Sequence, residues 1–132
     1  MQLDALAFGA HPDDVELACA GTLIKLFSNG YKTGAMALTD GELGTRGTRE
    51  IRCQEFGNSA QVMGLARHGT LGLPDGHIEL NWENKLKLIR EIRKSRPHII
   101  FAPYWQDRHP DHEKASELVR TSCFLSGLKK VN

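Results

Sequence analysis

The sequence predicts an α/β fold in three layers, with a mainly parallel sheet between two layers of helices. Short apolar runs alternate with longer amphipathic segments along the whole 132-residue chain, which is typical of strand-helix units that build a parallel sheet. The apolar runs are too short for helices and are bounded by Gly, Asn, Asp or Pro. No long Pro/Gly/Ser-rich linker interrupts the chain, so we expect one domain over residues 1–132.

The first half of the chain is expected to form two strands and two helices. In chain order these are a strand over 3–9, a helix over 15–28, a strand over 33–39 and a helix over 48–64. Asn29-Gly30 ends the first helix, and Asp40-Gly41 ends the second strand. Apolar spacing on the helices predicts that Leu17, Phe27 and Ile51 face the core.

The second half repeats this order. We expect a strand over 68–73, a helix over 82–95, a strand over 97–103 and a helix over 110–127. Pro74-Asp75-Gly76 is a turn signature that closes the third strand. In the third helix, Leu86, Ile89 and Ile92 recur every three residues with Lys and Arg between them, which predicts an amphipathic surface helix. Phe124 is expected to face inward in the last helix.

The composition excludes several classes of partner. The chain has 17 basic and 16 acidic residues and a net charge of +1, so we expect no nucleic acid and no anionic membrane as partner. No apolar run is long enough to span a bilayer, and the first residues lack the pattern of a signal peptide. The three cysteines are widely spaced and odd in number, which favours a reducing cytoplasm over a disulfide framework.

One four-residue motif occurs twice, each time after a predicted strand. His11–Asp14 reads His-Pro-Asp-Asp, and His109–His112 reads His-Pro-Asp-His. Proline suits the first position of a helix, and the acidic residues then lie in its first turn, where the helix N-terminus stabilises carboxylates. Ligands of parallel sheets bind beyond the carboxyl ends of the strands. The two motifs are therefore expected to meet in space.

Imidazole and carboxylate groups together predict a metal-dependent hydrolase. A catalytic zinc takes three such protein ligands and leaves one position for water; the metal lowers the pKa of that water to about 7, and a nearby carboxylate can take its proton. The two motifs offer six candidates: His11, Asp13, Asp14, His109, Asp111 and His112. Spacing alone does not assign their roles.

The two motifs resemble those of the PIG-L/LmbE family of zinc-dependent N-acetylglucosamine deacetylases, which have a Rossmann-like fold. Residues 39–47 and 71–76 further resemble the bacterial branch that acts on N-acetylglucosaminyl malate in bacillithiol biosynthesis. The resemblance implies hydrolysis of an acetamide to a free amine on a small-molecule N-acetylglucosamine conjugate. It also implies Zn²⁺ as cofactor, with Fe²⁺ as an alternative at the same site, and a homo-oligomeric assembly.

The resemblance also implies a role for individual residues. His11, Asp14 and His112 would hold the metal, Asp13 would be the general base, and His109 would stabilise the oxyanion and assist departure of the amine. The remaining site residues are Arg52 and Asp75 for substrate hydroxyls, Arg46 and Arg108 for the malate carboxylates, and Asp107 and Asp111 as partners that orient the imidazoles. Family members continue beyond the position of Asn132, so we expect either a fragment of the domain or a shortened relative, in both cases with an incomplete substrate wall.

Three other functions are compatible with these residues. Two histidines and one carboxylate also form the iron face of ferrous oxygenases. Another N-acetylglucosamine conjugate is an alternative substrate, and an inactive metal-binding fragment is an alternative to an enzyme. The glycine-rich stretch 41–47 lacks both G-x-G-x-x-G and the Walker lysine, so nucleotide binding is disfavoured.

Overall fold

The computed structural model describes residues 1–132 and contains all four predicted strands and all four predicted helices. In chain order they are β1 (Ala5–Gly9), α1 (Asp14–Ser28), β2 (Thr33–Thr39), α2 (Arg49–Met63), β3 (Arg67–Leu73), α3 (Trp82–Ser95), β4 (Ile99–Phe101) and α4 (Pro110–Ser126). The largest difference from prediction is β4, which spans only Ile99–Phe101 rather than residues 97–103. None of the helices combines the length and apolarity needed to cross a membrane.

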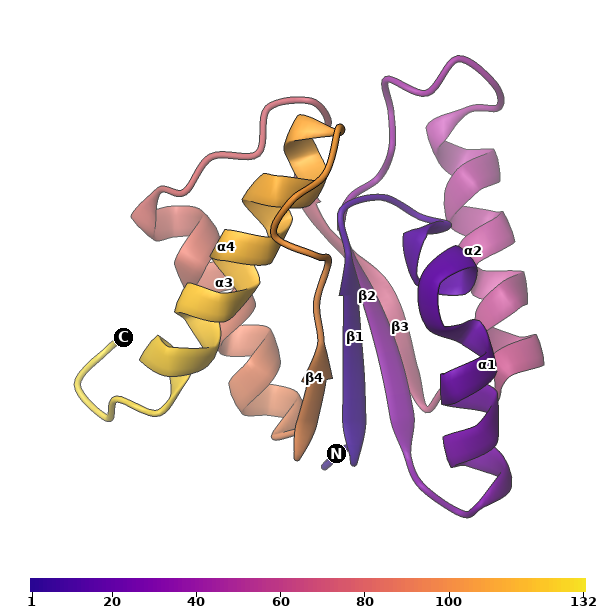
Figure 1. Cartoon of the computed structure of the whole chain (residues 1–132), viewed down its shortest axis with the longest axis horizontal. Coiled ribbons are helices and arrows are strands. Elements are labelled where there is room, and N and C mark those ends of the chain that lie inside the picture. Colours follow the sequence, from indigo (N-terminus) through magenta and orange to yellow (C-terminus); the bar gives the residue numbers. More distant parts are fainter.

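The four strands form one parallel sheet in the order β3-β2-β1-β4. In the register of this sheet, Ala7 of β1 lies beside Ala35 of β2 and Phe101 of β4. All four strands run in the same direction, so their carboxyl ends meet at one edge, the upper edge in Figure 1. The loops that follow β1 and β4 leave from this edge and carry the two His-Pro-Asp motifs.

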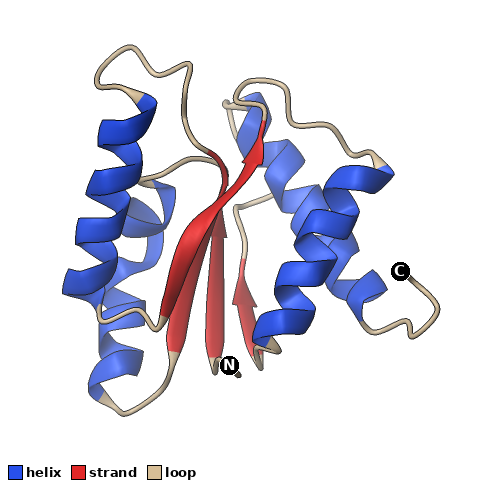
Figure 2. Cartoon of the chain, turned by 180° about the vertical axis from the view of Figure 1, so that it is seen from behind, coloured by secondary structure: helices blue, strands red, loops and turns tan.

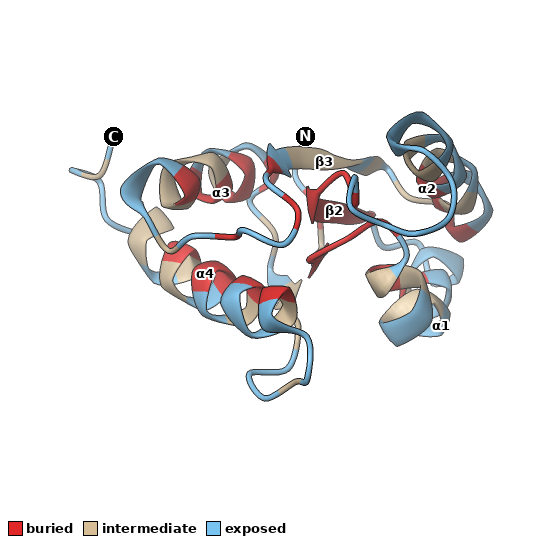
Figure 3. Cartoon of the chain, turned by 90° about the horizontal axis from the view of Figure 1, so that it is seen from above, coloured by how far each residue is buried: buried red, intermediate tan, exposed pale blue.

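Two helices cover each face of the sheet, as expected for three layers. Helices α1 and α2 lie on one face, and α3 and α4 lie on the other (Figures 1 and 2). Seen from above, the buried strands β1 and β2 lie between the two helix pairs (Figure 3). This arrangement confirms the predicted α/β/α fold.

Alternate side chains of the strands supply two separate cores. On the α3–α4 face, large residues such as Leu6, Phe8 and Leu38 pack against Leu88 and Leu118. On the α1–α2 face the strands offer small residues, and this cluster consists of Ala7, Ala35 and Ala37 with Val15, Leu23, Phe56 and Met63 from the helices. Since successive strand residues point to opposite faces, each strand contributes side chains to both cores.

Four helical side chains predicted to face the core are exposed instead. The exposed fractions are 85% for Leu17, 52% for Phe27, 47% for Ile51 and 73% for Phe124. Helix α1 is interrupted at Cys19, which has φ −144° and ψ 17°, so one helical period does not describe both of its halves. Leu17 precedes this break and lies about 200° around the helix from Val15. Since Val15 is buried, Leu17 points away from the core. The ring of Phe27 lies over Gly64, where a Cβ would come within 2.6 Å of it, so it covers the end of α2 rather than the sheet.

Candidate metal and catalytic site

The two His-Pro-Asp motifs come together beyond the carboxyl ends of β1 and β4. His11 follows β1, while His109 is the N-cap of α4 and His112 lies in the first turn of that helix. The ring centroids are 4.7 Å apart for His11 and His109, 5.4 Å for His11 and His112, and 4.8 Å for His109 and His112. Three imidazoles from two ends of the chain therefore share one site.

His11, Asp14 and His112 form a group that fits a metal ion. Their donor atoms all lie within 4.8 Å of one another. Asp14 Oδ2 is 3.4 Å from His11 Nδ1 and 3.3 Å from His112 Nε2. The backbone N–H of His11 donates to the same carboxylate oxygen at 2.8 Å, which fixes the Asp14 side chain. Gly9 makes room for this arrangement, because a Cβ there would be 2.9 Å from Asp14 Cβ.

Each of the two imidazoles has a second carboxylate on its far nitrogen. His11 Nε2 lies 2.8 Å from Asp111 Oδ2, and His112 Nδ1 lies 3.1 Å from Asp107 Oδ2. A carboxylate only accepts, so these ring nitrogens carry protons. His11 Nδ1 and His112 Nε2 face Asp14 and are the nitrogens that would bind a metal in place of a proton. Carboxylate–imidazole pairs of this kind orient metal ligands in many sites.

Contacts between the imidazoles and carboxylates shift the pKa values of His11, Asp14 and Asp111. Burial alone lowers the pKa of His11, but hydrogen bonds to Asp14 and Asp111 outweigh it and raise the pKa to about 9. For Asp14 and Asp111, burial acts to raise the pKa, and hydrogen bonds from His11 and from backbone N–H groups lower it overall. The site therefore concentrates negative charge around His11, which favours either a proton or a cation there.

A second trio of His11, His109 and Asp111 has donor atoms within the same 4.8 Å limit. Its carboxylate is already engaged, because Asp111 Oδ2 also accepts from the backbone N–H of Gly76 at 2.8 Å. In addition, His109 Nδ1 accepts from the N–H of Asp111 at 3.1 Å. These bonds leave the first trio as the better metal group.

Asp13 lies at the start of α1 in a strained backbone conformation. Its φ of 115° and ψ of −25° fall in the left-handed region, which few residues other than glycine, Asn and Asp adopt. The side chain lines the same cavity as His11 and His109 and is 59% exposed. Partial burial and the neighbouring Asp14 carboxylate raise the pKa of Asp13. A strained backbone that directs a side chain into a cavity is a common feature of catalytic sites.

Arg52 lines this cavity, but its guanidinium is engaged with the backbone. Nη1 donates to the Gly41 carbonyl at 2.8 Å, and Nη2 donates to the Pro12 carbonyl at 2.9 Å. Nη2 is also 3.5 Å from Asp13 Oδ2. A Cβ on Gly44 would come within 2.7 Å of Nη1. The glycine-rich loop therefore wraps around this side chain and is joined by it to the first motif.

Asp75 is buried at the cavity wall. Its Oδ2 accepts from the N–H of Leu43 at 2.8 Å, and its own N–H donates to Glu42 at 2.8 Å. Asp75 Oδ1 also lies 3.1 Å from His11 Nε2. The carboxylate thus connects the glycine-rich loop to a candidate metal ligand, in addition to the substrate contact expected from the sequence.

The expected carboxylate-binding pair, Arg46 and Arg108, is not brought to the cavity. Both side chains are exposed, and neither lines this hollow of about 410 Å³. Its lining residues are His11, Asp13, Asp14, Leu17, Leu43, Gly44, Arg52, Asp75, Gly76, His109 and His112. Sequence reasoning did not anticipate Leu17 or Leu43 here. Leu17 lies on the side of α1 opposite the buried Val15, and it lines the cavity there.

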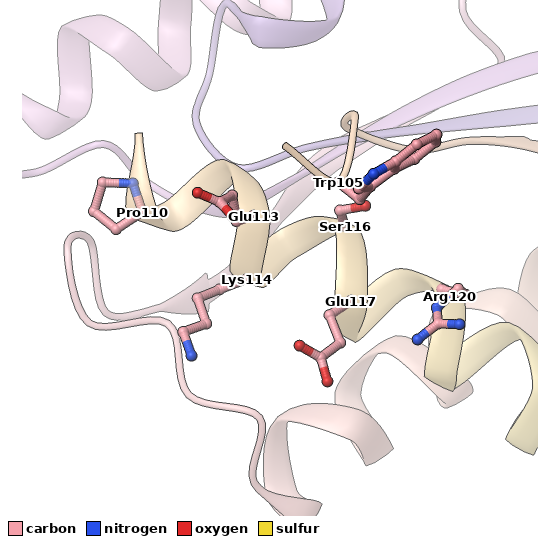
Figure 4. A pocket seen from close by; sticks show the side chains of 7 residues that line it. All are labelled: Trp105, Pro110, Glu113, Lys114, Ser116, Glu117 and Arg120. Carbon is pink, nitrogen blue, oxygen red and sulfur yellow. The ribbon is translucent and has the colours of Figure 1, made fainter. Parts of the chain in front are cut away.

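A larger hollow of about 700 Å³ lies along the outer face of α4, away from these residues. Figure 4 shows it between Trp105 and the charged side chains Glu113, Lys114, Glu117 and Arg120. It contains none of the candidate ligands. Size alone therefore does not identify the site in this protein.

A three-layer α/β/α fold with a His-Asp-His group at the carboxyl ends of its parallel strands defines a class of α/β proteins with a candidate metal site. A family model narrows this class: residues 6–123 match "PIG-L: GlcNAc-PI de-N-acetylase". The chain belongs to this family.

The relatives of the chain include named deacetylases. The diacetylchitobiose deacetylase of Thermococcus kodakarensis is 31% identical, over 96% of this chain and 51% of its own length. A probable N-acetyl-α-D-glucosaminyl L-malate deacetylase 2 of Bacillus anthracis is 25% identical, over 83% of this chain and 54% of its own. The crystal structure of the conserved protein TT1542 from Thermus thermophilus is 44% identical with a TM-score of 0.94, over 98% of this chain and 59% of that one. The chain thus spans between half and three-fifths of the length of these proteins.

Proposed function

We propose that this chain forms the metal and catalytic site of a deacetylase that hydrolyses the acetamide of an N-acetylglucosamine conjugate. The observation that carries the proposal is the convergence of His11, Asp14 and His112, whose donor atoms lie within 4.8 Å of one another. Asp13 and His109 line the same cavity. The family of the chain and the names of its relatives support the same reaction.

Zn²⁺ is the proposed metal, with Fe²⁺ as the alternative at the same site. Two imidazole nitrogens and one carboxylate oxygen suit a catalytic zinc that keeps one position open. The carboxylates of Asp111 and Asp107 on the far ring nitrogens support this fit. When bound, such an ion acidifies a water molecule and polarises an acyl oxygen.

Asp13 carries the proton transfers in this proposal, and His109 stabilises the charge that develops. Asp13 takes a proton from the attacking water, whose oxygen bonds to the acetyl carbon. His109 Nδ1 accepts from the Asp111 N–H, so Nε2 carries the ring proton and donates a hydrogen bond to the oxyanion, which assists departure of the amine. Asp13 then gives the proton that it took to the leaving nitrogen as the C–N bond breaks. The products are the free amine and acetic acid, which keeps the water oxygen and ionises to acetate.

N-acetylglucosaminyl malate is the first substrate that we propose. The Bacillus anthracis relative supports it, while the Thermococcus relative supports diacetylchitobiose as the second. Arg52 and Asp75 would hold sugar hydroxyls, since both line the cavity. Arg46 and Arg108 would meet malate carboxylates only at the outer rim, because both are exposed.

The domain organisation, partners, location and oligomeric state are also proposals. We propose one domain over residues 1–132 that acts on a small molecule, without nucleic acid or membrane. The cytoplasm is the proposed location, which the three unpaired cysteines support. A homo-oligomer rests on the family resemblance alone.

The test is acetate release by the purified chain. The protein is stripped with a chelator, reloaded with Zn²⁺ or Fe²⁺, and incubated with N-acetylglucosaminyl malate or diacetylchitobiose. We expect acetate only after reloading. Metal binding without acetate from any N-acetylglucosamine conjugate would identify an inactive metal-binding module. Acetate release that a chelator does not affect would contradict the proposed site.

A further inference from the structure

Asp13 has a backbone conformation that its own side chain does not stabilise. It is one of two non-glycine residues with positive φ, together with Arg96, and its φ of 115° lies far from the extended conformation usual at a helix N-cap. The Asp13 carboxylate makes no capping hydrogen bond to α1. A conformation of this kind persists only where the surrounding structure holds it, so another group supplies that support.

The guanidinium of Arg52 contacts the peptide unit that precedes Asp13. Nη2 donates to the Pro12 carbonyl at 2.9 Å, which fixes the orientation of the peptide unit that carries the Asp13 nitrogen. The same Nη2 lies 3.5 Å from Asp13 Oδ2, so it faces the side chain as well as the backbone. Arg52 thus contacts both the peptide unit and the carboxylate that decide where Asp13 points.

Arg52 is itself held at both ends by regular parts of the fold. Its backbone lies in the first turn of α2, where its N–H donates to the Thr48 carbonyl at 2.9 Å. Its Nη1 donates to the Gly41 carbonyl at 2.8 Å, and the N–H of Gly41 donates to Thr39 Oγ1 at the end of β2 at 3.1 Å. The Arg52 side chain is only 18% exposed. Because both ends are anchored, Arg52 can hold Asp13 rather than follow its movements.

We propose that Arg52 is a positioning residue, which keeps Asp13 in its left-handed conformation with the carboxylate directed into the cavity. Whatever Arg52 contributes to sugar binding, its effect on the rate of hydrolysis then passes through Asp13. The catalytic part of this inference rests on the proposed function, in which Asp13 is the general base. The part that concerns the conformation of Asp13 does not.

The first measurement reads the conformation of Asp13 without any reaction. In the ¹⁵N-labelled chain, the three-bond coupling between the amide proton and Hα of Asp13 is small at φ 115° and large for an extended backbone. We expect Arg52→Ala to raise this coupling, because Asp13 relaxes toward the extended conformation usual at an N-cap. Arg52→Lys keeps a positive charge but cannot donate to both carbonyls at once. It should raise the coupling by less, and it serves as the test if the alanine variant does not fold.

The second measurement is steady-state hydrolysis of diacetylchitobiose and N-acetylglucosaminyl malate by the zinc-loaded protein. Loss of a sugar contact raises KM, whereas a misdirected base lowers kcat. We expect Arg52→Ala to lower kcat by about tenfold or more, since Asp13 then spends less time in the productive conformation. Arg49→Ala removes an exposed arginine and its ion pair with Asp40 from the same helix. It leaves the first motif untouched and should change neither kcat nor the Asp13 coupling.

The outcomes separate this inference from the proposed function. An Asp13 coupling that stays small in both Arg52 variants would overturn the positioning role, whatever the variants do to hydrolysis. A raised KM with kcat retained would also overturn it, and would leave the deacetylase standing with Arg52 as a substrate contact. A raised coupling in a protein whose wild type hydrolyses no N-acetylglucosamine conjugate would support the positioning of Asp13 and count against the deacetylase.

Discussion

The imidazole of His11 and the carboxylate of Asp111 lie 2.8 Å apart, although 100 positions separate them in the sequence. Asp111 also accepts from the backbone N–H of Gly76, so one buried carboxylate joins the loops that follow β1 and β3 to the start of α4. This bond fixes the protonated nitrogen of His11 as Nε2 and turns Nδ1 toward Asp14. The orientation of the candidate metal ligand thus depends on a residue outside the ligand group.

Removal of this carboxylate should weaken metal binding. We expect Asp111→Ala to reduce zinc affinity by about 10- to 100-fold, because His11 loses the partner that sets its tautomer and ring orientation. Competition with a chromogenic chelator measures the affinity. Glu113→Ala, at an exposed position in the same helical turn, is the control and should bind as the wild type does. Equal affinity in both variants would contradict the orienting role.

Asp13→Asn should separate catalysis from metal binding. Asparagine tolerates positive φ, so the backbone at φ 115° is expected to remain, while the amide cannot take a proton. We expect acetate release to fall by about 100-fold or more, with zinc content unchanged. Metal content and acetate are measured on the same preparation. A variant that loses its zinc would indicate that Asp13 is a ligand rather than a base.

Arg52 and Gly41 should be energetically coupled. Arg52→Ala removes the donors for the carbonyls of Gly41 and Pro12, and we expect it to cost about 1–3 kcal/mol of unfolding free energy. Gly41→Ala places a methyl against the Arg52 guanidinium at φ +67°. This clash is absent once Arg52 is alanine, so the double variant should be more stable than the sum of the two by about 1 kcal/mol.

Urea unfolding of the four proteins in this cycle gives the coupling. Arg46→Ala is the matched control, since Arg46 is exposed in the same loop, and it should lie within about 0.5 kcal/mol of the wild type. Strict additivity of the two changes would contradict the contact between the loop and Arg52.

Glu91 should make stability depend on pH. Burial acts to raise the pKa of Glu91, but the ion pair with Arg67 and a hydrogen bond from Ser95 outweigh it and lower the pKa below 4.5. Because the folded-state pKa lies below the unfolded one, the stabilisation is present above about pH 4.5 and is lost as the pH falls through the folded value.

Glu91→Gln is therefore expected to lower the urea midpoint near neutral pH and to flatten its decline between about pH 5 and about pH 3. The control is Glu83→Gln on the same helix, where the carboxylate is 79% exposed beside Lys87, and its profile should follow the wild type. A Glu91→Gln profile parallel to the wild type would count against the ion pair with Arg67.

Much of the fold depends on local sequence patterns and could be predicted from them. Strands β1, β2 and β4 lie in short, mainly apolar runs, and β3 is marked by the Pro74-Asp75-Gly76 turn at its end. All eight elements were therefore predicted in order. Side-chain directions were less accessible. Leu17 was grouped with Val15 on one apolar face, but the two lie about 200° apart around an α-helix. The structure buries Val15 and exposes Leu17.

The sequence by itself determined the parallel sheet, the position of both His-Pro-Asp motifs at its carboxyl edge, and a surplus of six candidate ligands. Only the tertiary structure decided which atoms meet. It distinguished Arg52, which joins the glycine-rich loop to the first motif, from Arg46 and Arg108, which stay outside the cavity. The physical reason is that such contacts join segments far apart in the chain, and their distances depend on how the helices and loops pack on the sheet.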